Sequence, residues 1–279
     1  MLKKITVGLT LSGGGLKGIA HIGVIKALLE NNIVPEIISG TSAGAIVGTA
    51  YAAGYGPDEM EEIIANISLL KMFSNIGLPK AGFIKMDYLQ QRVLSIVPQD
   101  TFESLKMPFY VCTTNLNTGR ADIYSTGKLS DKIMASCAVP WLFKPVEIDG
   151  EVHIDGGIMN NMPALIIRDK CDVLIGSNVK PKLMIASNKE LQTFKGLTQR
   201  FVDLSLWMST KPNLKCLDVY IAPQKLVDLG YFEIGKSKYI IELGYEETML
   251  KMDAIKTSIK KAEALQEMST LEKSPHFGL

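Results

Sequence analysis

Apolar runs alternate with helically spaced apolar residues over the first part of the chain. Ile5–Leu11 is a short run rich in β-branched residues that ends in glycines, which predicts a buried strand. Lys17–Asn31 then places apolar residues at intervals of three and four, and this spacing predicts a helix. Pro35–Ser39 predicts a second buried strand, and the small residues of Ala43–Ala53 predict a second helix. This alternation of strands and helices is typical of a parallel α/β sheet.

Further strands are predicted after this first unit. They are Phe109–Thr114, Val146–Ile148, Glu151–Ile154, Val173–Ser177 and Val219–Ala222. Asp149-Gly150 joins two of these alternating runs, and this dipeptide is a strong signal for a two-residue hairpin turn.

Two of the remaining segments are predicted to be mainly helical. Pro57–Asp100 contains an apolar cluster around Gly77, Pro79 and Gly82, which is either core under a loop or an apolar lid over a lipid site. Glu246–Glu267 has the spacing of an amphipathic helix, and Met268–Leu279 is predicted to be a loose tail. Without repeats or shifts in composition, we expect residues 1–279 to form a single domain.

Composition narrows the classes of protein that fit. Hydrophobic residues make up 47% and charged residues 21%, which is typical of a globular chain, and the net charge of +1 gives no reason to expect nucleic acid as a partner. The widely spaced cysteines predict reduced thiols instead of disulfides or a zinc site; they are Cys112, Cys137, Cys171 and Cys216. No apolar run reaches the roughly 18 residues of a membrane span, so we predict a cytoplasmic protein with at most peripheral membrane contact.

A short motif, Gly40-Thr41-Ser42-Ala43-Gly44, lies between the second predicted strand and the second predicted helix. A G-x-S-x-G sequence in this context is typical of a nucleophile elbow, a tight turn that lifts a serine toward a substrate. The amides that open the following helix favour developing negative charge. The alternative is a glycine-rich turn with a helix-capping serine, but the context favours Ser42 as a nucleophile.

A glycine-rich loop, Gly13–Gly18, follows the first predicted strand. Its backbone N–H groups can approach an anion closely, because glycines carry no side chains. The expected members of an oxyanion hole are Gly13, Gly14, Gly15 and Ala43. Lys17 would add positive charge nearby. The alternative is a packing turn that lets the helix approach the strand.

The same loop also satisfies the G-x-G-x-x-G fingerprint of dinucleotide-binding proteins. That fingerprint requires an acidic residue at the end of the second strand, to bind the ribose hydroxyls. Here the strand ends in Gly40-Thr41-Ser42, and Glu36 lies at its beginning. We therefore rank a dinucleotide site below the oxyanion hole, and we expect no cofactor.

A third motif, Asp155-Gly156-Gly157, follows the predicted strand Glu151–Ile154. It could be an ordinary Asp-Gly turn. Asp149-Gly150 has the same chemistry but lies between two strands as a hairpin turn, whereas Asp155 lies where a parallel sheet presents catalytic groups.

Histidine is scarce, although a serine nucleophile usually has a histidine base. His21 is predicted to pack in the first helix, and His153 shares a strand with Asp155. His276 lies near the C-terminus and would complete a Ser–Asp–His order, which leaves a conventional triad as an open alternative. If none of these serves, an aspartate acting directly on serine remains.

The three motifs, in this order, resemble the patatin-like phospholipase family of bacterial serine acyl hydrolases. The segments around Ala138-Val139-Pro140 and Asn160–Pro163 are also similar to that family, and the resemblance covers about residues 5–180. It implies a three-layer α/β/α fold with a mainly parallel sheet, as in FabD/lysophospholipase-like proteins. The supporting residues around the motifs are Lys17, Gly18, Gly40, Gly44, Gly156 and Gly157.

The resemblance also implies a chemistry. Ser42 would be the nucleophile, Asp155 its base and Gly14 and Gly15 part of the oxyanion loop, in metal-free hydrolysis of phospholipid or lysophospholipid esters. Lys17 stands where the family more often has arginine, so the charge is kept without the bidentate fork. Two alternatives are a non-catalytic lipid- or acyl-binding protein and an acyltransferase, and the latter usually has histidine at the position of Thr41.

Overall fold

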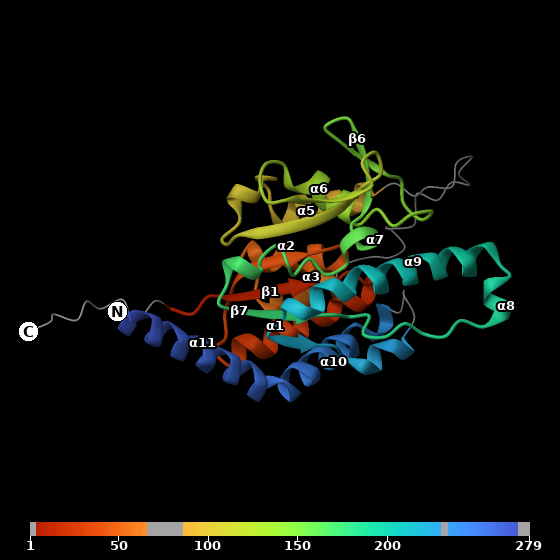
Figure 1. Cartoon of the computed structure of the whole chain (residues 1–279). Coiled ribbons are helices and arrows are strands. Elements are labelled where there is room, and N and C mark those ends of the chain that lie inside the picture. The colour runs from red at the N-terminus through yellow and green to blue at the C-terminus, as the bar shows by residue number, and fades with distance from the viewer. Residues whose placement is uncertain (1–3, 66–85, 230–233, 273–279) are drawn as a thin grey trace, which may run out of the picture.

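The computed structural model of the chain describes residues 4–65, 86–229 and 234–272 (Figure 1). Its described strands form one mixed sheet in the order β5-β6-β3-β2-β1-β7-β8, with β4 paired to β3. The strands are β1 (Val7–Leu11), β2 (Pro35–Gly40), β3 (Phe109–Asn115), β4 (Arg120–Tyr124), β5 (Val146–Ile148), β6 (Glu151–Asp155), β7 (Val173–Ser177) and β8 (Val219–Ile221).

The helices are distributed over the whole chain. The α-helices are α1 (Ala20–Glu30), α2 (Ala43–Ala52), α3 (Pro57–Ala65), α5 (Asp87–Ile96), α6 (Leu129–Ser136), α7 (Gly157–Asn160), α8 (Asn188–Leu191), α9 (Phe194–Thr210), α10 (Ser237–Leu250) and α11 (Met252–Glu272). The 3-10 helices used below are η1 (Gly15–Ile19), η3 (Arg168–Lys170) and η4 (Lys211–Cys216).

Parallel pairing dominates the centre of the sheet. β8, β7, β1, β2 and β3 are successively parallel, and the central strands are buried almost throughout. This arrangement explains their continuous apolar sequences, because helices cover both faces of such a sheet. The predicted mainly parallel α/β fold is confirmed, with antiparallel pairing at β4, β5 and β6.

β3 brings the ends of two strands together. Along one edge, Val111–Asn115 of β3 pairs with β4, so β2 and β6 must share the other edge of β3. Gly40 of β2 lies opposite Val111, and Asp155 of β6 lies opposite Thr113, two residues further on. β2 and β6 therefore run toward each other, and the residues that follow Gly40 meet the end of β6.

Two apolar layers cover the sheet. Neighbouring residues of a strand face opposite sides, and in β2 Ile38 packs into the layer that contains α1, α2 and α10, while Ile37 packs against Ala164 and Ile167. Figure 1 shows α10 and α11 along the lower side of the molecule and α9 crossing on the side of α7. The chain thus forms the predicted three layers.

α1 and α10 cross at two glycines. A Cβ on Gly23 would lie 1.9 Å from the carbonyl oxygen of Ile241, and one on Gly244 would lie 2.0 Å from that of Ala20. Real side chains do not tolerate such distances, so the contact requires glycine in both helices. The residue touched by α10, Ala20, directly follows η1.

Several local predictions are confirmed or corrected. The Asp149-Gly150 hairpin is confirmed, with positive φ at both residues (52° and 84°). The predicted helix Glu246–Glu267 is wrong in its extent: α10 ends at Leu250, and the Lys251 amide donates to the carbonyl of Thr248 (3.0 Å) before α11 begins. α11 continues to Glu272, so the first residues of the predicted loose tail are helical.

Helices α3 and α5 confirm the helical prediction at both ends of Pro57–Asp100. The apolar cluster interpreted as core or lid lies within residues 66–85, outside the described residues. Among the helices that the structure does describe, none has both the length and the apolar composition to cross a membrane.

Candidate active site

Ser42 occupies a sharp turn between β2 and α2. Its backbone angles, φ 54° and ψ −122°, lie outside the regions that residues other than glycine normally adopt. A Cβ on Gly40 would lie 2.6 Å from the carbonyl oxygen of Gly44, and one on Gly44 would lie 2.3 Å from that of Leu11. The turn therefore needs glycine on both sides, as the G-x-S-x-G pattern predicts.

Ser136 holds this turn from a neighbouring helix. The Ser42 amide donates to Ser136 Oγ (2.9 Å), and Ser136 Oγ donates to the carbonyl of Cys112 in β3 (2.7 Å). Thr41 Oγ1 donates to the carbonyl of Asn160 (2.9 Å) on the other side. The sequence analysis missed Ser136, because a serine at the end of an amphipathic helix carries no motif.

Asp155 ends β6 beside Ser42, as the register of β3 requires. Both residues are almost fully buried, with 6% and 8% of their surfaces exposed. Burial raises the pKa of Asp155 from 3.8 to about 6, against the opposing effects of hydrogen bonds from the Ser42 side chain and the Gly157 amide (2.8 Å). The carboxylate is thus ionised near neutral pH and can accept a proton.

The glycine loop lies against the same two side chains. Gly13, Gly14 and Gly15, with Ala43, line the cavity that contains Ser42 and Asp155. The Gly13 amide donates to the carbonyl of Asn161 (3.1 Å), so its hydrogen is already used. Among the described residues, the amides of Gly14, Gly15 and Ala43 have no protein acceptor, which leaves these three as candidate oxyanion donors.

Lys17 lies away from this cavity. Its side chain is buried and lines a separate cavity of about 210 Å³ that also contains Lys180 and Asp203, which form an ion pair. Gly18 serves packing, because a Cβ there would lie 2.4 Å from Cβ of Ala43. The sequence analysis expected this charge beside the oxyanion hole, but the side chain lines a different cavity, because the sequence could not show which side of the loop Lys17 faces.

Asn161 joins two of the glycine motifs. Its Oδ1 would lie 2.7 Å from a Cβ on Gly13 and 3.1 Å from one on Gly157, and it has no partner among the described residues. Its Nδ2 donates to Thr210 Oγ1 (3.1 Å) and its amide to Ser209 Oγ (3.1 Å), so α9 fixes it. It was not a predicted site residue, although it belongs to the family-like segment after Asp155.

A Cβ on Gly156 would lie 2.2 Å from the carbonyl oxygen of Cys112, and one on Gly157 would lie 2.3 Å from Leu206 Cδ2 of α9. The two glycines after Asp155 thus let β3 and α9 approach it closely. Their role here is packing around the carboxylate, in addition to the hydrogen bond that the Gly157 amide donates.

His21 is a structural residue. Its Nε2 lies 2.9 Å from the Ser12 carbonyl oxygen and must carry the proton, so Nδ1 accepts from the Ser177 hydroxyl (2.8 Å). Burial lowers its pKa to about 4, against a smaller effect of the bond to Ser12. The predicted packing role of His21 therefore agrees with its contacts, and these contacts hold the strand that leads into the glycine loop.

The other histidines do not approach Ser42 in the described residues. His153 Nδ1 lies 3.0 Å from Thr113 Oγ1, and burial lowers its pKa against the opposing effect of nearby carboxylates. No histidine is among the described residues that line the Ser42 cavity. His276 lies outside the described residues.

One cluster has the composition of a metal site. Ligand atoms of Asp122, Glu151 and His153 lie within 4.8 Å of one another. Asn115 Nδ2 donates to both carboxylates (2.8 and 2.6 Å), and its Oδ1 accepts two backbone amides of the β3–β4 turn. The cluster is therefore a hydrogen-bonded network that joins β3, β4 and β6.

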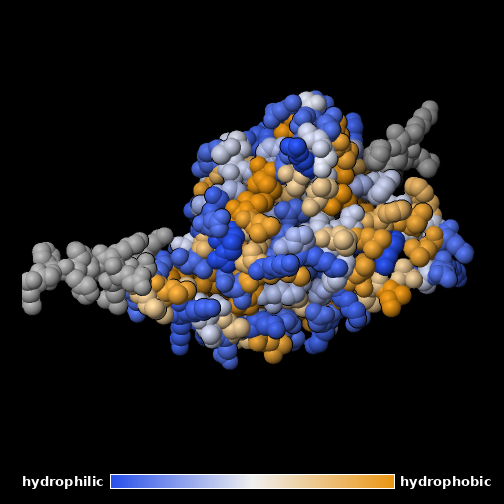
Figure 2. Space-filling model, in the orientation of Figure 1, coloured by the Kyte–Doolittle hydropathy of each residue, from blue (hydrophilic) through white to orange (hydrophobic). Residues whose placement is uncertain are grey.

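The cavity over Ser42 has a volume of about 420 Å³ and is mostly apolar. Its walls come from the glycine loop, from Val139–Phe143 and from one face of α9. A neighbouring face of α9 exposes large apolar side chains and shares Phe194 with the cavity, and Figure 2 shows the resulting apolar surface along the outer part of this helix. They are Phe194, Leu197, Phe201, Leu204 and Met208.

Comparison with known proteins relates this site to a family. The sequence model described as patatin-like phospholipase matches residues 9–167. An uncharacterised NTE family protein of Mycobacterium tuberculosis is 33% identical over 159 residues, which are 56% of this chain and 44% of that protein. Lysophospholipase NTE1 of Mycosarcoma maydis is 28% identical over 174 residues, 58% of this chain and 9% of that protein. The chain thus spans less than half the length of these relatives.

Two solved structures share the fold. VipD from Legionella pneumophila superposes with a TM-score of 0.61 at 16% identity, over 91% of this chain and 67% of that chain. Human GIVD cytosolic phospholipase A2, solved with methyl gamma-linolenyl fluorophosphonate, gives 0.50 at 12% identity, over 95% and 60%. Both likenesses extend beyond residue 167, to the part of the chain that holds α9, α10 and α11.

Proposed function

Since this chain belongs to the patatin-like phospholipase family, we propose that it is a serine hydrolase of lipid acyl esters. The family and the fold predicted from the sequence motifs are thereby confirmed. The observation that carries the proposed activity is the contact between Ser42, in a strained turn, and the buried carboxyl of Asp155 at the floor of one apolar cavity.

In the first half of the reaction, the Ser42 hydroxyl attacks the ester carbonyl carbon. Asp155 takes the hydroxyl proton as the bond forms, because its ionised carboxylate already accepts a hydrogen bond from Ser42. The carbonyl oxygen becomes an oxyanion. We propose that the amides of Gly14, Gly15 and Ala43 stabilise it, since those of Gly15 and Ala43 lie at helix N-termini.

Collapse of this intermediate breaks the ester bond. The leaving alkoxide takes the proton from Asp155 and departs as an alcohol, which leaves Ser42 acylated. A water molecule then attacks the acyl-serine while Asp155 accepts its proton. When the second intermediate collapses, the bond between the acyl carbon and Ser42 Oγ breaks and the fatty acid leaves. The proton returns from Asp155 to Ser42 Oγ, so both residues end as they began.

Lipids are the substrate class that fits the cavity. Its mostly apolar walls suit a lipid ester better than a polar one, and relatives are named lysophospholipases. The exposed apolar face of α9 borders the same cavity, because Phe194 belongs to both. We propose that this face contacts a lipid surface peripherally, so that a lipid passes into the cavity with little exposure to water.

Labelling with a fluorophosphonate probe tests the proposal. Such a probe phosphonylates only an activated serine, so the wild type should be labelled and Ser42→Ala should not. Asp155→Asn should lower the labelling rate by at least about a hundredfold, within the usual range for loss of a general base. His276→Ala should label like the wild type.

Two outcomes contradict the proposed dyad. Loss of labelling in His276→Ala would establish a conventional triad in place of the dyad. Absence of labelling in folded wild-type protein that still binds lipid would favour the non-catalytic lipid-binding alternative.

A further inference from the structure

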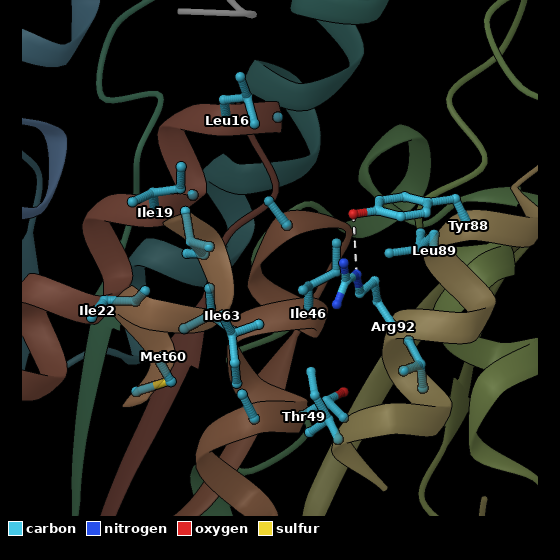
Figure 3. A pocket seen from close by; sticks show the side chains of 18 residues that line it. Leu16, Ile19, Ile22, Ile46, Thr49, Met60, Ile63, Tyr88, Leu89 and Arg92 are labelled. Carbon is cyan, nitrogen blue, oxygen red and sulfur yellow. Dashed lines mark hydrogen bonds between the residues drawn. The ribbon is translucent and has the colours of Figure 1, made fainter. Parts of the chain in front are cut away.

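A second cavity lies behind the glycine loop. It has a volume of about 120 Å³ and is lined by residues of η1, α1, α2, α3 and α5. Figure 3 shows Ile22, Met60 and Ile63 on one side of it and Leu89 on the other. The two glycine-containing motifs reach this cavity only through Gly15, Leu16, Gly18 and Ala43, and its other walls are ordinary apolar positions of the helices, which carry no motif.

The second cavity adjoins the one that contains Ser42. Leu16, Ala43, Ile46 and Leu89 line both. Ala43 directly follows Ser42, and Gly15, whose amide is a candidate oxyanion donor, also borders both cavities. If these amides hold the carbonyl oxygen of an ester, the carbonyl carbon lies at the boundary between the two cavities. The acyl chain and the alkoxy group on that carbon can then enter different cavities.

The polar groups of the second cavity are engaged by the protein itself. Thr49 Oγ1 donates to the carbonyl of Ala45 (2.8 Å) within α2. Arg92 Nε donates to the Tyr88 hydroxyl (3.1 Å), drawn as a dashed line in Figure 3, and its guanidinium lies 5.0 Å from the centre of that ring. The surface offered to a ligand is thus almost entirely carbon. A polar head group would lose its hydration there without gaining partners.

We propose that this second cavity binds the acyl chain of the ester, while the alcohol part of the substrate stays in the larger cavity beside α9. The inference rests on the proposed function and extends it, because it assigns the acyl and alcohol sides of the substrate to separate cavities. Residues of α3 and α5 form part of its wall, so their side chains limit the acyl length that the enzyme prefers. Ile63, which lines this cavity alone, is then a specificity-determining residue.

The first experiment varies the acyl chain with a constant leaving group. Ile63→Trp narrows the cavity, and kcat/KM is measured with p-nitrophenyl butyrate, octanoate and dodecanoate. In Ile63→Trp, kcat/KM for the dodecanoate ester should fall about tenfold or more below the wild-type value. kcat/KM for the butyrate ester should change less than about twofold. Ile63→Ala should shift the preference toward dodecanoate. Leu94→Trp, on α5 but not in the cavity wall, is the matched control and should keep the wild-type profile.

The second experiment reverses the ester. Ile63→Trp should impair hydrolysis of butyl octanoate and spare octyl butyrate, because only the first carries its long chain on the acyl side. Impairment of octyl butyrate alone would overturn the inference in favour of a site for the alcohol chain.

An unchanged chain-length profile in both Ile63 variants would also overturn the inference, with fluorophosphonate labelling showing that each is folded and active. That result would leave the serine hydrolase intact. Failure of the proposed function is a different result, namely wild-type protein that neither labels nor hydrolyses butyrate.

Discussion

At the scale of single residues, Asp155 is the group whose surroundings matter most. The described residues that line its cavity include no lysine, arginine or histidine, so no cation there opposes the effect of burial. For this reason burial raises the pKa of Asp155 to about 6. A carboxylate paired with arginine would show the opposite shift, because the positive charge lowers its pKa.

The activity should therefore depend on pH through Asp155. The protonated carboxyl cannot accept the Ser42 proton, so kcat/KM for p-nitrophenyl butyrate should fall as pH drops through about 6 and approach a plateau above it. A pH profile of the wild type checks this. A plateau that continues down to pH of about 4 would exclude Asp155 as a base with a raised pKa.

The ionised form of Asp155 that the reaction needs should lower the stability of the fold. In the unfolded chain Asp155 ionises near pH 3.8, and in the folded chain near 6, so folding becomes less favourable as pH rises between these values and stays so above them. Asp155→Asn removes this penalty and should stabilise the fold by about 1–3 kcal/mol at pH 8, but not below pH of about 4. Urea unfolding at both values measures the difference. Equal free energies of unfolding for the wild type and Asp155→Asn at pH 8 would show that burial of the Asp155 carboxylate does not destabilise the fold.

At the scale of elements, the crossing of α1 and α10 depends on glycine. Gly244→Ala places a methyl group against the backbone of Ala20, and the helices must separate at a cost of about 1–3 kcal/mol or more. Gly235→Ala is the matched control, because nothing lies within 4 Å of its added Cβ. Thermal unfolding compares the two. Since Ala20 follows η1, the fluorophosphonate labelling rate should also fall in Gly244→Ala. Equal unfolding temperatures and labelling rates for Gly244→Ala and Gly235→Ala would show that the crossing is not tight.

The elements that the sequence predicts are those with local constraints. The turn at Ser42 needs Gly40 and Gly44 for steric reasons, so a short motif is enough to predict its geometry. β4 and α9 were missed. β4 is half-exposed and contains the charged residues Arg120 and Asp122, so it lacks the apolar run of a buried strand. α9 carries apolar residues on both its cavity-lining and its exposed face, and this hides the helical period.

Contacts between distant segments could not be predicted. Ser136 reaches the Ser42 amide, and Asn161 reaches Gly13, only through the fold of the sheet. The direction of Lys17 depends in the same way on Lys180 and Asp203, which lie far along the chain. The sequence therefore predicts Ser42 and Asp155 as the reacting groups but does not predict Ser136 and Asn161, which contact the two motifs.

At the scale of the whole molecule, the exposed apolar face of α9 borders the Ser42 cavity through Phe194. Phe201 is 56% exposed on this face and does not line that cavity. Phe201→Glu should reduce sedimentation with phosphatidylcholine vesicles and hydrolysis of vesicle lipid about tenfold, because a charge in an apolar contact is costly. Hydrolysis of soluble butyrate ester should be unchanged.

Leu250→Glu is the matched control for this prediction, because Leu250 is an exposed apolar residue at the end of α10. It should bind vesicles like the wild type. If the two variants lose vesicle binding equally, α9 is not the face that meets the lipid.

The crossing of α1 and α10 also limits how the chain can be recombined. The family match ends at residue 167, yet the carbonyl of Ala20, just after the glycine loop, is in contact with Gly244. A chimera that joins residues 9–167 to the C-terminal segment of a relative will accept only a helix with a small residue at the matching point. In such exchanges the compatible unit is the pair of crossing helices, so a crossover placed inside α1 or α10 should fail even where the three motifs are intact.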